Sequence, residues 1–187
     1  WPSGFAGGKV PMSDKSFRLK ALVAREYNQS FPENCEKITD FENKLSIYKW
    51  TAPLGHDWVN GTCYSDMMNR EAMQLFLKES YQSYYDRYSK YYGDTITCQF
   101  TDEPCTIFRG RLPHGAVPYT DAVPATFKKL HGYDPVDQLH KLFIDCEGGE
   151  QFRIYYFRTG KYLFEHNCSK QLADWWADHD IALTGHY

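Results

Sequence analysis

Several kinds of segment are missing from this chain, and each absence argues against a class of protein. No run of about 18 apolar residues occurs, so the sequence predicts no helix that spans a membrane. The 21 basic residues form no cluster and are outnumbered by 24 acidic ones, so we expect no nucleic-acid partner. No charged segment followed by an apolar one opens the chain, so no secretion signal is visible.

Paired cysteines are also missing. The six cysteines are scattered, and no two of them form a CxxC pair. This spacing argues against a compact zinc site and against a dense disulfide framework. Thiols with mostly apolar neighbours suit a reducing compartment, so the composition favours a cytoplasmic location.

What the sequence does contain is typical of a globular domain. The chain has 187 residues, of which 42% are hydrophobic and 24% charged, so we expect a single α/β domain over residues 1–187. Aromatic residues reach 17%, which is high. Aromatic rings pack protein cores, and they also line sugar-binding clefts, where a ring face stacks on a pyranose.

The clearest element is an amphipathic helix over residues 69–92. Asn69 is a suitable N-cap, and Gly93 stands where a helix commonly ends. We expect a strand over residues 58–66 before this helix and a buried strand over residues 95–100 after it. A strand, a helix and a strand in this order predict a βαβ unit with parallel strands and a right-handed crossover.

Other segments extend the pattern on both sides. KALVAREYN and KLSIYKW read as strands, and residues 151–180 as a second long helix with a kink near Gly160 or Asn167. A segment over residues 101–124 is irregular, and a loop of that length is usually functional. PATFKKLHGYD and VDQLHKLFID read as two short helices, and IALTGHY as the last strand.

Polar side chains follow three of the predicted strands. Asp66 ends the strand before the long helix, Asp102 and Glu103 follow the strand after it, and His186 follows the last strand. Ligands bind at the carboxyl ends of parallel strands, so we expect these side chains to face one mouth. Asp102 and Glu103 leave the strand in different directions, so one can reach a substrate while the other braces the loop.

Structural roles account for the same residues. An Asp-Glu pair after a strand is typical of a turn or a helix N-cap, and Pro104 suits the first position of a helical turn. Asp66 can hold the N-terminus of the following helix, and His186 can be structural. On the residues alone, these alternatives stay open.

Six stretches, taken together, resemble one enzyme family. In chain order they are WPSGFAGG, YSDMMNREAMQLFL, FTDEP, HGYD, YYFRTGKYLFEHN and IALTGHY. Nearly the whole chain resembles the catalytic domain of large bacterial glycoside hydrolases related to the α-L-rhamnosidases and β-galactosidase-like enzymes. In that family a (β/α)8 barrel is flanked by β-sandwich domains. The resemblance implies a partial TIM barrel, about half complete, with parallel strands and outer helices.

The family's chemistry is hydrolysis of O-glycosidic bonds, here of plant or host glycans. A glycosidase uses two carboxyl groups, and the protonated one delivers a proton to the leaving oxygen. Glu103, at the end of the fourth barrel strand, matches the position of this general acid. The resemblance places the partner carboxylate on a later strand, which this chain does not reach. We therefore expect a fragment that is inactive alone, or one that self-associates through its open sheet edges.

The resemblance also implies a substrate-binding set. Asp66 and Asp102 would position sugar hydroxyls, and His186 with Trp1 or Trp58 would line the cleft. Some rhamnosidase relatives use calcium, which carboxylates bind, but no EF-hand spacing occurs, and we otherwise expect no cofactor. Two other functions stay open, a non-catalytic carbohydrate-binding module and a structural α/β domain whose carboxylates are caps.

Overall fold

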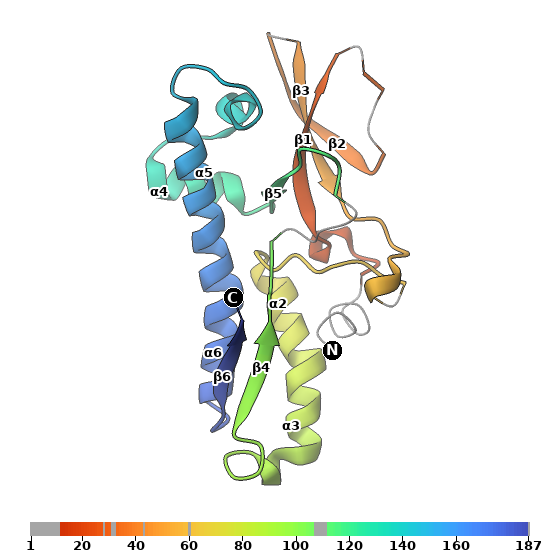
Figure 1. Ribbon diagram of the computed structural model, residues 1–187, viewed down its shortest axis with the longest axis vertical. Coiled ribbons are helices and arrows are strands. Elements are labelled where there is room, and N and C mark those ends of the chain that lie inside the picture. The colour runs from red at the N-terminus through yellow and green to blue at the C-terminus, as the bar shows by residue number, and fades with distance from the viewer. Residues whose placement is uncertain are drawn as a thin grey trace.

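The computed structural model describes residues 12–27, 29–30, 33–42, 44–59, 61–106 and 112–186, and for Trp58 the backbone alone. These residues form a four-stranded antiparallel sheet, two long helical segments and a separate pair of parallel strands (Figure 1). The predictions made for Trp1 and for the Trp58 side chain lie outside the described residues.

The antiparallel sheet has the strand order β2-β3-β1-β5. Its strands are β1 (Lys20–Glu26), β2 (Cys35–Phe41), β3 (Leu45–Thr51) and β5 (Val117–Tyr119). The sequence predicts β1 and β3, and both predictions are confirmed. It does not predict β2, whose charged side chains suit the edge of a sheet.

Both faces of this sheet are buried. Leu22 of β1 and Ile47 of β3 share one face and pack with Phe127, Phe152 and other side chains of the helices beside the sheet. Val23 and Trp50 lie on the opposite face, in a core that includes buried residues of the other helices. Cover on both sides explains why consecutive residues of the central strands, such as 20–23 and 46–48, are buried.

The helix predicted over residues 69–92 is confirmed. It comprises α2 (Arg70–Leu77), a π-helical turn (Lys78–Gln82), α3 (Ser83–Tyr88) and a 3-10 turn (Ser89–Tyr91). The Asn69 side-chain oxygen accepts the backbone N–H groups of Glu71 and Ala72 at 2.9 and 3.1 Å, which makes Asn69 the predicted N-cap. Gly93 ends the segment with φ +81°.

The second helical pattern is confirmed as well. It runs from α5 (Gly149–Phe164) through a π-helical turn (Glu165–Ser169) into α6 (Lys170–Ala177), so the expected kink is a π turn near Asn167, and Gly160 does not interrupt the helix. The two short helices before it are α4 (Val123–His131) and a 3-10 helix (Val136–Leu142). Further 3-10 turns are Lys15–Phe17 and Asp57–Val59.

β4 (Cys98–Asp102) and β6 (Ala182–His186) pair in parallel, separately from the larger sheet. Both occur near the places that the sequence predicts. In Figure 1 they lie beside the lower helices, and β6 contacts α6 directly. The last predicted strand is thereby confirmed.

The prediction of half a (β/α)8 barrel is wrong. Among the described strands only β4 and β6 pair in parallel, and the rest form the antiparallel sheet. The predicted βαβ unit fails at its first strand, because residues 58–66 form no strand. Asp57–Val59 is a 3-10 turn, and Gly61, with φ +75°, lies in a tight loop closed by a bridge between His56 and Thr62.

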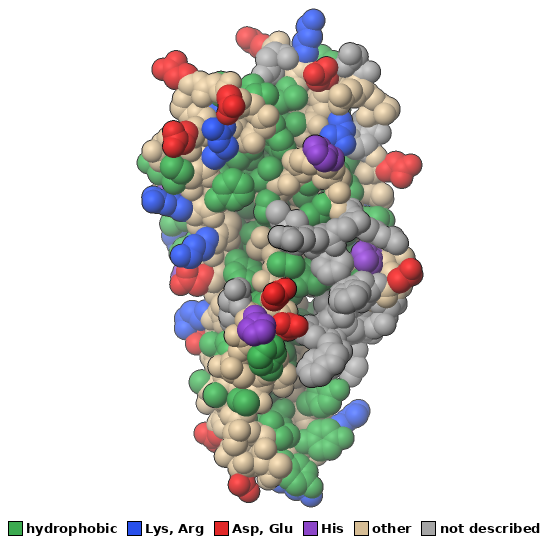
Figure 2. All heavy atoms as spheres, viewed as in Figure 1, with side chains coloured by type: hydrophobic (Ala, Val, Ile, Leu, Met, Phe, Trp, Pro, Cys, Tyr) green, Lys and Arg blue, Asp and Glu red, His purple; other side chains and the backbone are tan. Residues whose placement is uncertain are grey.

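Two further observations concern the length of the apolar helices and the distribution of charge on the surface. No helix in the described part of the chain is long and apolar enough to cross a membrane. The face drawn in Figure 2 mixes acidic and basic side chains around exposed hydrophobic ones, without a large patch of one sign among the side chains it describes.

Candidate functional site

The carboxyl ends of β4 and β6 bring three of the predicted site residues together. The parallel register pairs Asp102 with His186. Asp102 Oδ1 lies 3.4 Å from His186 Nδ1, a contact that is ionic when the imidazole is protonated. The backbone N–H of Glu103 donates to the carbonyl oxygen of His186 at 3.2 Å. Residues far apart in the sequence therefore meet at one strand end, as the predicted strand ends require.

This meeting depends on Gly185. Its φ is +146°, and a Cβ atom added there would lie 1.9 Å from the carbonyl oxygen of Thr101, the residue it pairs with on β4. A distance that short is a clash with backbone, so only glycine fits. The glycine of the TGH stretch thus allows β6 to place His186 beside Asp102.

Glu103 has a rare backbone conformation. Its φ is +45°, in the left-handed region, where a residue with a Cβ atom is disfavoured. Strained residues of this kind concentrate at active sites and ligand clamps. The Glu103 side chain is exposed, directly after the last residue of β4. The predicted acid therefore lies at a strand end, in a conformation that costs free energy.

Phe100 is a member of this surface that the sequence analysis misses. The sequence predicts a buried strand there, but the Phe100 side chain is 43% exposed. Its ring lies edge-to-face against the His186 ring, with centroids 5.2 Å apart. Phe100 and Asp102 lie on the same exposed side of β4, because the buried Thr101 separates them along the strand. Phe100, Asp102, Glu103 and His186 together are called the β4–β6 end.

Asp66 lies elsewhere and is buried, with 1% exposure. Its Oδ2 accepts the Thr120 hydroxyl at 2.7 Å and faces Lys20 Nζ at 3.4 Å, while Oδ1 accepts the Met68 N–H at 3.1 Å. Burial raises the pKa of Asp66 to about 6, against the opposing effects of Lys20 and these hydrogen bonds. In this conformation protein groups occupy both oxygens, so its substrate role stays a prediction.

The three predicted carboxylates do not converge on a cation. Within the described ranges no group of three or more His, Cys, Asp or Glu side chains is arranged to hold a metal ion. The suggestion of calcium bound by Asp66, Asp102 and Glu103 therefore finds no support in their placement. All six cysteines are described, and none is bonded to another.

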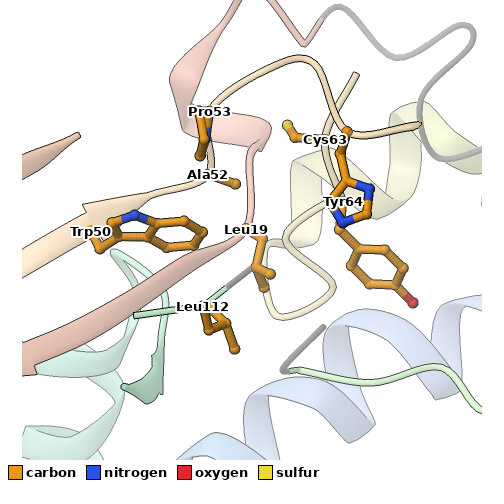
Figure 3. Close-up of a pocket in the computed structure, with 8 residues that line it drawn as sticks. Leu19, Trp50, Ala52, Pro53, Cys63, Tyr64 and Leu112 are labelled. Carbon is orange, nitrogen blue, oxygen red and sulfur yellow. The ribbon is translucent and has the colours of Figure 1, made fainter. Parts of the chain in front are cut away.

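Two cavities lie near these elements. The larger, of about 340 Å³, lies between α5 and residues 104–106, which directly follow Glu103. The smaller, of about 20 Å³, has Trp50, Leu19 and Tyr64 around it (Figure 3). That volume is room for about one water molecule, so the smaller cavity is not a ligand site. Its Cys63 thiol is buried, and burial raises its pKa to about 11.

Comparisons with known proteins add no assignment. No protein-family model matches the chain, and no curated protein matches it.

Proposed function

We propose that the β4–β6 end is the acidic part of a glycoside-hydrolysing site, with Glu103 as the acid that protonates the leaving oxygen. The observation that carries this proposal is the parallel register of β4 and β6, which pairs Asp102 with His186 next to Glu103. The FTDEP and TGH motifs, on which the family resemblance partly rests, are the sequences of these two strand ends.

The four residues have complementary chemistry. Glu103 provides a carboxyl group for proton transfer, and the strained backbone at this position fits a functional role. Asp102 and His186 provide an acceptor and an imidazole for sugar hydroxyls. The exposed ring of Phe100 provides an apolar face on which a sugar can stack. A glycosidase also needs a second carboxyl group on the other side of the scissile bond, and we assign none in this chain.

A second candidate function is saccharide binding without hydrolysis. The exposure of Glu103 favours it, because a glycosidase acid works in a site that is partly shielded from water. Phe100, Asp102 and His186 suffice for binding, since stacking and hydrogen bonds to hydroxyls require no proton transfer. In this reading Glu103 braces the strand end through its hydrogen bond to His186.

The test is release of nitrophenol from a panel of aryl glycosides that includes the α-L-rhamnoside and the β-D-galactoside. We expect Glu103→Gln to reduce kcat/KM by about a hundredfold or more, because the acid is lost while the side-chain shape is kept. Glu147→Gln is the matched control, since Glu147 is an exposed carboxylate in the loop before α5. Hydrolysis that survives Glu103→Gln unchanged would refute the assigned role.

Binding measurements separate the two candidates. Saccharide binding without hydrolysis, retained in Glu103→Gln and lost in Phe100→Ala, would establish the non-catalytic function. A folded chain that neither hydrolyses nor binds any glycoside of the panel would leave only structural roles for these carboxylates.

A further inference from the structure

The larger cavity adjoins the β4–β6 end but is not part of it. Its volume of about 340 Å³ lies within the range of about 300–1,000 Å³ that is usual for small-molecule sites. Residues 104–106 form one wall, and Met68 and Pro118 contribute to the others. The cavity is partly open rather than enclosed.

One stripe of α5 forms the longest wall. Phe157 and Phe164 are each three or four residues from Gly160 and Lys161, which places the four residues on one side of the helix. Tyr156 also lines the cavity, and its hydroxyl donates to the Pro118 carbonyl at 2.8 Å. With that hydroxyl satisfied, the aromatic side chains of α5 present mainly ring surface, which suits a flat apolar group.

Gly160 gives the cavity its depth. A glycine inside a helix is less stable than an alanine, so its presence calls for a reason. Close packing is not the reason, because a Cβ atom added at Gly160 would have Met68 Sδ as its nearest neighbour, at 3.9 Å. That is an ordinary contact distance. The missing side chain therefore serves to leave space at the wall.

Lys161 is the one charged residue among the described residues that line the cavity. Its side chain is exposed, and it takes part in none of the ion pairs found among the described residues. An ammonium group beside aromatic walls favours a ligand that combines a ring with an anion.

We propose that this cavity binds a small flat aromatic ring that carries one carboxylate, with the ring against Phe157 and Phe164 and the carboxylate on Lys161. The inference goes beyond the proposed function and does not depend on it, because binding involves no bond cleavage and uses none of the four residues of the β4–β6 end.

The test compares two probes that differ in charge, 4-hydroxybenzoate and 4-hydroxybenzyl alcohol, by calorimetric titration of the 187-residue chain. We expect the acid to bind more tightly than the alcohol. Lys161→Gln should weaken binding of the acid roughly fivefold and leave the alcohol unaffected. Lys129→Gln, at an exposed lysine of α4, is the matched control and should change neither.

Two variants of Gly160 test the space itself. Gly160→Leu should weaken binding of the acid roughly tenfold or more, because its side chain occupies the cavity. Gly160→Ala should raise the melting temperature and weaken binding less, so weaker binding in this variant cannot be attributed to loss of folding. Equal binding of the two probes, no binding of the acid by the folded chain, or unchanged binding in Gly160→Leu would each overturn the proposal.

Discussion

Two carboxylates, Asp66 and Glu103, differ completely in their surroundings. Asp66 is buried and engaged by Lys20 and Thr120, so it joins the loop before α2 to the sheet. Glu103 is exposed and held by its backbone alone, through a hydrogen bond to the carbonyl of His186. The buried carboxylate therefore has a structural role in holding these segments together, whereas the exposed carboxylate is available to a ligand.

The strain at Glu103 predicts a change in stability. Glu103→Gly should raise the free energy of unfolding by about 0.5–1 kcal/mol, because glycine adopts a φ of +45° without the Cβ contact that disfavours it. Glu103→Gln keeps the Cβ atom and should stay close to the unmodified chain. Urea denaturation of the three proteins measures the difference. A glycine variant less stable than the glutamine variant would show that the backbone there is not strained.

Asp66 predicts a dependence of stability on pH. Burial raises its pKa from 3.8 to about 6, so the folded chain binds this proton more tightly than the unfolded chain. The contribution of Asp66 to the free energy of unfolding is therefore greatest below about pH 4, and it falls, on the order of 3 kcal/mol, as pH rises to about 6–7.

Urea denaturation between pH 4 and pH 8 measures this contribution, with Asp66→Asn as the comparison. The asparagine variant has no proton to lose, so its stability should not show this fall. Its stability at neutral pH should be lower by about 1–3 kcal/mol, because the asparagine NH2 group cannot accept either of the hydrogen bonds that the two carboxylate oxygens accept from Thr120 and Met68. Identical pH profiles for the two proteins would contradict the raised pKa.

At the scale of elements, local signals predicted the helices, whereas the sheets depend on distant contacts. Asn69 and Gly93 fix the ends of the first helical segment through their own backbone chemistry, and both were readable from the sequence. The apolar residues of 58–66 are typical of a strand, but Asp57–Val59 is a 3-10 turn and no described residue of 58–66 belongs to a strand. β2 is an edge strand with several charged residues and no clear apolar face, so its sequence does not indicate a strand.

The candidate site, too, could be predicted from the sequence only in part. Asp102, Glu103 and His186 were expected to meet because each follows a strand, and the parallel pairing places them together. The exposure of Phe100 was not predictable, because it depends on which face of β4 other elements cover. The cavity beside α5 was not predictable either, because residues 104–106 lie next to that helix only in the folded chain.

Gly185 predicts how the two strands depend on each other. Gly185→Ala should lower the free energy of unfolding by about 2–3 kcal/mol, because the added methyl group meets the Thr101 carbonyl and the left-handed backbone is disfavoured. Gly115→Ala is the matched control, with φ +72° and no atom within 4 Å of the added Cβ, and should cost only about 1 kcal/mol. Equal losses in urea denaturation would show that β4 and β6 do not approach this closely.

Across the whole molecule, the antiparallel sheet and the β4–β6 pair differ in how far they are buried. The sheet is buried on both faces and anchors the two cores. Parallel strands are normally covered on both faces, yet Phe100 and Asp102 of β4 and His186 of β6 are exposed. Packing does not explain the exposed carboxylates and the exposed aromatic ring of this parallel pair, so the pair is the part of the molecule that most suggests a functional role. The expected self-association stays a prediction, although the half barrel from which it was inferred is absent among the described strands.

A titration of the isotope-labelled chain with methyl α-L-rhamnoside and methyl β-D-galactoside, followed through backbone amide shifts in NMR spectra, tests directly whether the β4–β6 end binds a saccharide. It locates a saccharide whether or not hydrolysis occurs. We expect the shifts to concentrate at residues 100–103 and 184–186 and to disappear in Phe100→Ala. Shifts confined to other parts of the chain, or none at saturating concentrations of either glycoside, would contradict this expectation.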